Sequence, residues 1–455
     1  MVREALAGSR RDLTAMPLGR AVFLIAIPMI LEMIAESIFA VVDIFWVSML
    51  GADAIAAVGL TESLMTIVYA GAMGLSIGVG AVVSRRTGAK DPAGASRAAV
   101  QAVVIGVGVS IVVGSLGTLA GPRLLALMGA SPAVQAIGSG YTRTIFAGSA
   151  SVILLFLINA AFRGAGDAAL TMRTLWLANG INIVLGPVFI FGLGPAPRLG
   201  VTGAAVATTI GRGIGVLYQL HNLRRGRGRL SMPRSEMRID LETLKTILRI
   251  SRSAMLQMFI GMTSWVGLVR ILSTFGSAAL AGYTVAIRVV LFALLPAFGL
   301  GNAAATLVGQ NLGAGNPARA EQAVWRAAFY NFVFLGAVGL CLFIAGNGIV
   351  RLFTSEADVV AAGGRCLRIV AIGFPLYAYG MVVSQAFNGA GDTRTPTWIN
   401  FGCFWLGEIP AAYLLARVLG MGPTGAYISI TLAFSAVALA SVTIFRRGRW
   451  KLVKV

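Results

Sequence analysis

Charged side chains are scarce in this chain of 455 residues, since Asp, Glu, Lys and Arg make up 12% of it, whereas soluble domains carry about 25%. Hydrophobic residues make up 57%. So few charges cannot cover the surface of a soluble protein of this size, and intrinsic disorder requires the opposite balance. The composition therefore excludes a large soluble enzyme and predicts an all-α polytopic membrane protein.

Histidine and cysteine are also nearly absent. The single histidine, His221, lies at a basic helix end, and three cysteines, Cys341, Cys366 and Cys403, are widely spaced within apolar runs. This pattern contains no disulfide framework, no zinc-ligand spacing and no histidine-based catalytic cluster. We therefore expect a protein that is not an enzyme and that uses no cofactor.

Twelve apolar segments are long enough to cross a bilayer, which takes about 20 residues of helix. Gly, Pro and Asp separate them, as turns require. Because several of the segments are longer than a bilayer requires, we expect those helices to tilt or to extend beyond the hydrocarbon. The twelve segments are 17–49, 54–83, 97–121, 133–162, 168–194, 201–222, 246–273, 278–308, 321–347, 358–387, 394–418 and 424–445.

The positive charge, a net +20, is concentrated in alternate connections. Lys and Arg collect in the two terminal tails and in the loops near 84–97, 163–173, 224–252, 311–326 and 388–397. By the positive-inside rule these segments are cytoplasmic, so both termini are predicted to lie in the cytoplasm. The Ala-, Gly- and Arg-rich composition favours the plasma membrane of a prokaryote, the inner membrane of the cell. This asymmetry explains the charge without a nucleic-acid partner.

The chain contains an internal repeat. The segment 161–167, AFRGAGD, recurs as AFNGAGD at 386–392, and 88–92, GAKDP, recurs as GAGNP at 313–317, both at an offset of 225 residues. The Gly-Ala-Gly-Asp segments lack the Lys-Ser/Thr of a nucleotide-binding loop. We interpret them as tight turns in which Asp167 and Asp392 cap the next helix.

The repeat predicts two lobes of six helices each. An even number of spans brings both halves into the membrane from the same side, so the pseudo-two-fold axis that relates them runs along the membrane normal, with a cleft between the lobes. The longest polar connection separates the halves. We accordingly predict an N-terminal lobe at 1–222, a basic cytoplasmic linker at 223–245 and a C-terminal lobe at 246–455.

Five acidic residues fall inside predicted spans, namely Glu32, Glu36, Asp43, Glu62 and Glu408. Ionisable groups in a membrane are costly and functional by default. Glu32, Glu36 and Asp43 lie within an arc of roughly 40° on the first helix, and so form one stripe. The stripe is expected to face the lobe interior or the cleft. For Glu32, solvation or a salt bridge near the cytoplasmic mouth is an alternative.

The paired AFxGAGD segments, the twelve spans and the segment 302–315, NAAATLVGQNLGAG, resemble the multidrug and toxic compound extrusion (MATE) transporters. The resemblance covers essentially the whole chain. It implies an antiporter that exports amphipathic, often cationic, compounds in exchange for Na⁺ or H⁺. It also implies two lobes that rock between inward-open and outward-open states.

The resemblance further implies a cation-coupling site in the N-terminal lobe. Asp43 matches the family's first-helix aspartate, Asn159 and Asn182 match asparagines on the fourth and fifth helices, and Thr208 is a sixth-helix oxygen donor. Asp43, Asn159 and Asn182 are the candidate Na⁺ ligands, since Na⁺ takes oxygen donors, whereas a proton requires only a carboxylate. Where the family often has a second aspartate this chain has Gly186, and our hypothesis is that Glu36 replaces it.

Polar and aromatic positions of both lobes are candidates for lining the substrate cleft. Aromatic rings bind flat cations, although helix packing is an alternative role for each position. Glu408 either attracts a cationic substrate or pairs with Arg270 or Arg288. The candidate cleft residues are Glu32, Gln257, Trp265, Tyr377, Gln385 and Glu408.

The sequence features favour one of four functions open to a membrane protein of this kind. The main prediction is a cation-coupled exporter of amphipathic drugs or metabolites that acts as a monomer in the lipid bilayer. A lipid-linked oligosaccharide flippase of the same superfamily is the alternative, but it requires a basic cleft for a pyrophosphate, and the acidic stripe disfavours it. A membrane-embedded enzyme requires His or Asp motifs that are lacking, and the duplication disfavours a receptor or channel.

Overall fold

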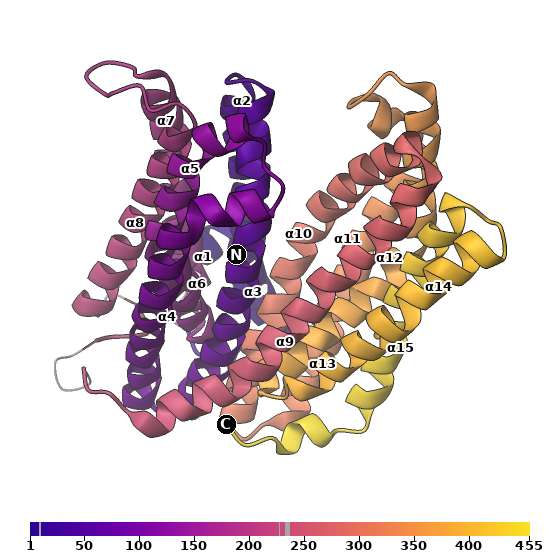
Figure 1. The fold of residues 1–455 in the computed structure, drawn as a ribbon. Coiled ribbons are helices and arrows are strands. Elements are labelled where there is room, and N and C mark those ends of the chain that lie inside the picture. Colours follow the sequence, from indigo (N-terminus) through magenta and orange to yellow (C-terminus); the bar gives the residue numbers. More distant parts are fainter. Residues whose placement is uncertain (9–10, 227, 233–236) are drawn as a thin grey trace.

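The computed structural model describes residues 1–8, 11–226, 228–232 and 237–455, and this part of the chain contains helices and loops but no strand. Residues 227 and 233–236 of the predicted linker lie outside the described residues. The helices form two bundles that meet at one end of the molecule and diverge toward the other (Figure 1). The all-α, two-lobed architecture predicted from the sequence is thus confirmed.

The N-terminal lobe contains the helices before the linker. A short helix, α1, precedes the first long one, and the fourth predicted span is divided at Gly148 into α5 and α6. The bounds are α1 Val2–Ala7, α2 Leu18–Ser48, α3 Ala52–Gly88, α4 Pro92–Leu127, α5 Pro132–Ala147, α6 Ser149–Gly164, α7 Ala168–Phe191 and α8 Val201–Arg225.

The C-terminal lobe repeats this order. Its fifth span is not a simple α-helix, because two π-helical segments, η3 and η4, flank the short helix α14. The bounds are α9 Leu241–Leu272, η2 Ser273–Phe275, α10 Ser277–Gly313, α11 Pro317–Arg351, α12 Ala357–Ala390, α13 Arg394–Asn400, η3 Phe401–Glu408, α14 Ile409–Tyr413, η4 Leu414–Val418, α15 Pro423–Arg446 and η5 Arg449–Leu452.

The structure contains a helical segment for each of the twelve predicted spans, but one of these segments, α8, is less apolar than the others. Within the described residues ten helical segments are long and apolar enough to cross a membrane, and the α5–α6 pair, bent by 40°, makes an eleventh. The remaining predicted span is α8, a helix of 25 residues whose polar side chains include Arg212, Gln219 and Asn222. These side chains are buried among the other helices of the lobe, which is why a helix of low apolarity is accommodated there.

The two lobes contact each other mainly through four helices at the end where they meet, which we call the base. α3 packs against α9 and α10, and α2 packs against α10. Under the 225-residue repeat α2 corresponds to α9 and α3 to α10, so the α2–α10 and α3–α9 contacts are equivalent. The α3–α10 contact lies on the pseudo-two-fold axis.

Glycines permit this contact. A Cβ at Gly88 would overlap the carbonyl oxygen of Gln310, and a Cβ at Gly313 would overlap the carbonyl oxygen of Arg85. These two contacts are related by the repeat, since Gly88 corresponds to Gly313 and Arg85 to Gln310. The backbones of α3 and α10 therefore touch because neither glycine has a side chain.

Polar contacts reinforce the base. Arg85 Nη2 donates to the carbonyl oxygens of Ala390 (3.2 Å) and Val453 (2.6 Å). In the repeat-related place, Gln310 Nε2 donates to the carbonyl oxygen of Gly164 at 2.9 Å. The C-terminal tail thus takes part in joining the lobes.

The Gly-Ala-Gly-Asp turns differ from each other. Asp392 accepts a hydrogen bond from the backbone N–H of Thr395 at 3.2 Å, as a capping residue does. Asp167 makes no side-chain capping bond to α7, so the predicted cap is wrong there. Burial raises the pKa of Asp167. The charge of Arg229 and the backbone N–H groups of Arg229 and Leu170 oppose that rise.

The Gly88–Gln310 contact predicts a position-specific sensitivity to alanine. Gly88→Ala is expected to lower the free energy of unfolding by about 1–3 kcal/mol, as overpacking does. Gly59→Ala on the same helix is the matched control, because nothing lies within 4 Å of its Cβ, and it is expected to leave the melting temperature unchanged or higher. The melting temperatures of both variants in detergent test this. Equal behaviour of the two would contradict the proposed backbone contact.

Candidate functional site

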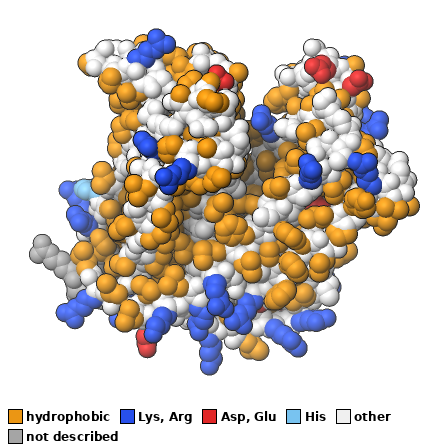
Figure 2. All heavy atoms as spheres, in the orientation of Figure 1, with side chains coloured by type: hydrophobic (Ala, Val, Ile, Leu, Met, Phe, Trp, Pro, Cys, Tyr) orange, Lys and Arg blue, Asp and Glu red, His pale blue; other side chains and the backbone are white. Residues whose placement is uncertain are grey.

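Three carboxylates of α2 and α3 gather on the inner side of the N-terminal lobe. Glu36 and Asp43 on α2 are partly buried, and Glu62 on α3 is exposed. Asp43 interacts electrostatically with Glu62 and with Arg212 of α8, and Glu62 interacts with Arg288 of α10 in the other lobe. The hollow between the lobes is visible in Figure 2. The group we call the acidic site, Glu36, Asp43 and Glu62, therefore borders this cleft.

Arg212 is the buried, positively charged residue of this site. It was not among the functional residues predicted from the sequence. It is 8% exposed. Its Nη1 donates to the hydroxyl oxygen of Tyr69 at 3.3 Å, and its guanidinium lies 5.6 Å from the centre of the Phe39 ring. Its charge acts on Glu36 and Asp43, yet no ion pair within 4 Å joins it to either acid in the described part of the chain. Any ionisable residue inside a membrane span is a functional candidate, arginine included. The position of Arg212 within a predicted span was therefore the signal that could have found it.

The amide and hydroxyl groups predicted to surround Asp43 are bonded elsewhere. Asn182 Nδ2 donates to Thr208 Oγ1 at 2.8 Å, and Asn159 Oδ1 accepts from Gln219 Nε2 at 2.6 Å. No hydrogen bond joins Asp43 to any of these groups among the described residues. Gln219, which was not among the residues predicted from the sequence, therefore competes with a cation for the oxygen of Asn159.

Gly186 faces the helix that carries Asp43. A Cβ at Gly186 would lie 3.5 Å from Cδ1 of Trp46, an ordinary contact. Trp46 lies three residues after Asp43, which places both on one side of α2. A Cβ atom is therefore accommodated at position 186, and a side chain there would point toward the face of α2 that bears Asp43.

Glu32 has a different environment from the other acids of its stripe. It is 1% exposed, its Oε1 lies 2.6 Å from Nη1 of Arg163, and its Oε2 accepts from the hydroxyl of Thr171 at 2.9 Å. The salt bridge considered as the alternative for Glu32 is present. Glu32 is thus charge-paired within the N-terminal lobe.

The candidate cleft residues of the C-terminal lobe fall into two groups. Trp265 and Tyr377 are partly buried and contact the rings of Tyr283 and Phe434, with centroids 6.2 and 4.4 Å apart. Gln385 accepts from Asn388 Nδ2 at 3.0 Å.

Gln257 and Glu408 are 4% and 5% exposed, and neither makes a side-chain hydrogen bond within the described ranges. No ion pair there joins Glu408 to Arg270 or Arg288. The pairing considered as an alternative for Glu408 is therefore not formed.

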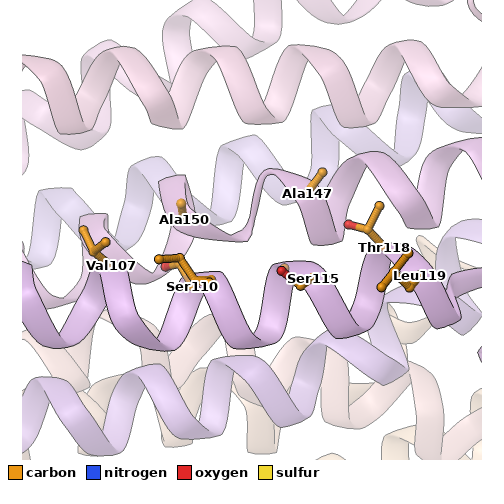
Figure 3. Close-up of a pocket in the computed structure, with 9 residues that line it drawn as sticks. Val107, Ser110, Ser115, Thr118, Leu119, Ala147 and Ala150 are labelled. Atoms are coloured by element: carbon orange, nitrogen blue, oxygen red, sulfur yellow. The ribbon is translucent and has the colours of Figure 1, made fainter.

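A separate groove of about 570 Å³ lies on the outside of the N-terminal lobe (Figure 3). It follows α4 beside the bend between α5 and α6. Two of its lining residues, Ile111 and Leu119, are 63% and 79% exposed. Its walls are mostly apolar, with the hydroxyl groups of Ser110, Ser115 and Thr118 among them, and they lie on α4 and beside the α5–α6 bend and not on the helices that border the cleft.

Within the described residues no group of three or more His, Cys, Asp or Glu side chains is placed to hold a metal ion. The acidic site can nevertheless bind a proton, or attract a cation that enters from the cleft, because its three carboxylates outnumber the two guanidinium groups, of Arg212 and Arg288, that act on it.

Comparisons with known proteins agree with this geometry. The family model described as MatE matches residues 28–188 and 251–414. The chain is 27% identical over 440 residues to the "Probable multidrug resistance protein YoeA" of Bacillus subtilis, covering 95% of this chain and 94% of that one. It is 26% identical over 354 residues to the "FAD transporter" of Shewanella oneidensis, covering 77% and 78%.

A solved structure has the same fold. It is described as the outward-facing conformation of a multidrug resistance MATE family transporter of the MOP superfamily. The two structures superpose with a TM-score of 0.90 at 26% identity, covering 97% of this chain and 98% of that one. The match includes both lobes.

The buried Glu32–Arg163 pair predicts a strongly destabilised single variant. Glu32→Gln leaves the guanidinium of Arg163 without its charge partner and is expected to cost about 3–5 kcal/mol. The double variant Glu32→Gln/Arg163→Gln removes both charges. Its loss in the free energy of unfolding is expected to be smaller than the sum of the losses of the two single variants. Thermal unfolding of the three variants measures this, and strictly additive losses would show that the pair is not coupled.

Proposed function

Since the chain belongs to the MATE family of transporters, we propose that it is a secondary active antiporter that exports amphipathic cations in exchange for H⁺ or Na⁺. The observation that carries the proposal is the acidic site of Glu36, Asp43 and Glu62, whose excess negative charge borders the cleft. Moving one positive charge outward against 100 mV requires about 2.3 kcal/mol. The inward movement of one coupling ion of the same charge offsets this.

In the proposed cycle the two lobes rock about the base. Many Lys and Arg side chains gather at this end of the molecule (Figure 2), which by the positive-inside rule favours a cytoplasmic location. The state described here is then closed to the cytoplasm and open to the outside. We keep the proposed division into 1–222, 223–245 and 246–455, with a monomer in the cytoplasmic membrane.

Asp43 is the proposed coupling residue, with Glu36 as the second carboxylate. Arg212 interacts with both acids, so a proton or cation that binds them must compete with a guanidinium already present in the site. Asn159, Asn182 and Thr208 are the proposed oxygen ligands for Na⁺. In this state Asn159 Oδ1 and Thr208 Oγ1 already accept hydrogen bonds, whereas Asn182 uses its Nδ2–H group. The engagement of two of the three oxygen atoms favours H⁺ over Na⁺ as the coupling ion.

The cationic cargo follows from the same charge balance. Trp265, Tyr377, Gln257, Gln385, Glu32 and Glu408 remain the proposed lining of the substrate path. The alternative, a flippase for lipid-linked oligosaccharides, requires a site for a pyrophosphate, and Arg288 is an exposed cation of α10 beside Glu62. Transport of an anionic lipid and not of a cation would favour that alternative.

Replacement of Asp43 tests the coupling. In proteoliposomes, Asp43→Asn is expected to abolish gradient-driven transport of a cationic dye, because the amide cannot exchange a proton or hold a cation. Asp53→Asn is the matched control, since Asp53 is exposed at the start of α3, and it is expected to transport normally. Dye efflux is measured with a proton gradient and with a Na⁺ gradient imposed separately. Equal efflux by the wild type and Asp43→Asn would contradict the proposed role.

Gly186 offers a gain-of-function test. Gly186→Asp adds a carboxylate toward the α2 face that bears Asp43 and is expected to raise the response of transport to Na⁺. Gly186→Asn has nearly the same volume without the charge and is expected to respond like the wild type. Na⁺-dependent dye efflux of the three proteins distinguishes them. An identical increase for Asp and Asn would show that the effect is steric and not electrostatic.

A further inference from the structure

Glu408 lies at an irregular place in the eleventh span. It is the last residue of the π-helical segment η3, where the backbone N–H of Ile409 donates to the carbonyl oxygen of Phe404, five residues earlier. Pro410 follows and has no N–H to donate. π-Helical turns are uncommon and occur frequently at functional sites. The irregular backbone therefore marks the segment that positions this carboxyl group.

Among the described residues, the carboxyl group of Glu408 has no charge partner. The residue is 5% exposed, and these residues provide neither an ion pair nor a side-chain hydrogen bond to it. No charged side chain of this part of the chain acts on it electrostatically, whereas Asp43 is influenced by Glu62 and Arg212. An ionised carboxylate that is buried and unpaired is strongly unfavourable. Its environment thus favours the neutral, protonated acid.

The side chains around Glu408 are polar but uncharged. Tyr283 of α10 and Tyr377 of α12 lie within electrostatic range of it. Tyr427 of α15 stacks on Tyr283 with the ring centres 6.4 Å apart, and Cys366 of α12 lies beside these two tyrosines. α9 packs on η3. Its polar side chains over 257–270 are Gln257, Thr263, Ser264, Trp265 and Arg270, and Arg270 makes no ion pair with Glu408.

Two of these polar groups lack partners of their own. The hydroxyl oxygen of Tyr283 and Oε1 of Gln257 are buried, and neither has a hydrogen-bond partner among the described residues. Buried polar atoms in folded proteins are nearly always bonded. An unbonded hydroxyl group on Tyr283, within electrostatic range of the unpaired acid, indicates a site whose bonding changes during function.

We propose that Glu408 is a second proton-binding site, located in the C-terminal lobe and separate from Asp43. In the cleft-open state the side chain is the neutral acid, beside Tyr283 and Tyr377. When the lobes rearrange and water or a cationic substrate reaches the π-helical segment, the O–H bond of the acid breaks and the proton passes to water. The same bond forms again on return to the cleft-open state. Its role in transport rests on the antiport proposed above, whereas the protonation of Glu408 does not.

Infrared spectroscopy tests the protonation directly, without transport. The purified wild-type protein is expected to show a protonated-carboxyl C=O band that Glu408→Gln lacks. Glu356→Gln is the matched control, because Glu356 is exposed at the start of α12, and it is expected to retain the band. Glu408→Gln mimics the neutral acid and is expected to unfold at a temperature no lower than the wild type. A spectrum of Glu408→Gln identical to that of the wild type would overturn the proposal.

Proton release tests the link to transport. On addition of tetraphenylphosphonium to weakly buffered protein, the wild type is expected to release about one proton more per molecule than Glu408→Gln. Asp43→Asn is also expected to release fewer protons, and the double variant the fewest. If Glu408→Gln released as many protons as the wild type, the second site would be excluded. A wild type that binds no tetraphenylphosphonium but retains the Glu408-dependent infrared band would contradict the proposed cargo and leave the protonation supported.

Discussion

Direct backbone contact between α3 and α10 at the base requires glycine at two equivalent positions, because any Cβ at Gly88 or Gly313 would overlap a carbonyl oxygen of the opposite helix. The contact is formed twice about one axis, and the same axis relates the lobes. Helices that touch only at one end leave the other end apart, which produces the cleft. The internal duplication therefore fixes where the lobes meet, and the absence of side chains there allows the contact to be compact.

Charge inside the membrane is distributed unequally between the two lobes. In the N-terminal lobe the acidic site faces one buried guanidinium, that of Arg212, so its carboxylates have a positive charge close by. In the C-terminal lobe Glu408 lies within electrostatic range of Tyr283 and Tyr377, and no cation among the described residues pairs with it. A coupling ion that binds the acidic site therefore competes with a guanidinium, whereas a proton on Glu408 has no such competitor.

The sequence predicted the fold well, because length, apolarity and the 225-residue repeat are global properties. It also predicted that Asp43 and Glu408 lie inside spans. It did not predict that Gln219 would bond Asn159, since side-chain pairing between α6 and α8 depends on helix rotation. It likewise gave no indication of the π-helical segments around Glu408. Local hydrogen-bond register is decided by packing against neighbouring helices, and an amino-acid pattern carries little information about it.

The claim that the lobes move about the base is tested most directly by paired distance measurements. Spin labels on Asp53 and Ser277, at the starts of α3 and α10, report the open end, and labels on Lys90 and Asn316 report the base. The distance within each pair of labels is measured by pulsed electron–electron double resonance at high and low pH, with and without a cationic substrate. The account predicts that the open-end distance shortens when the base distance lengthens. A base distance that stays constant while the open end closes would contradict it.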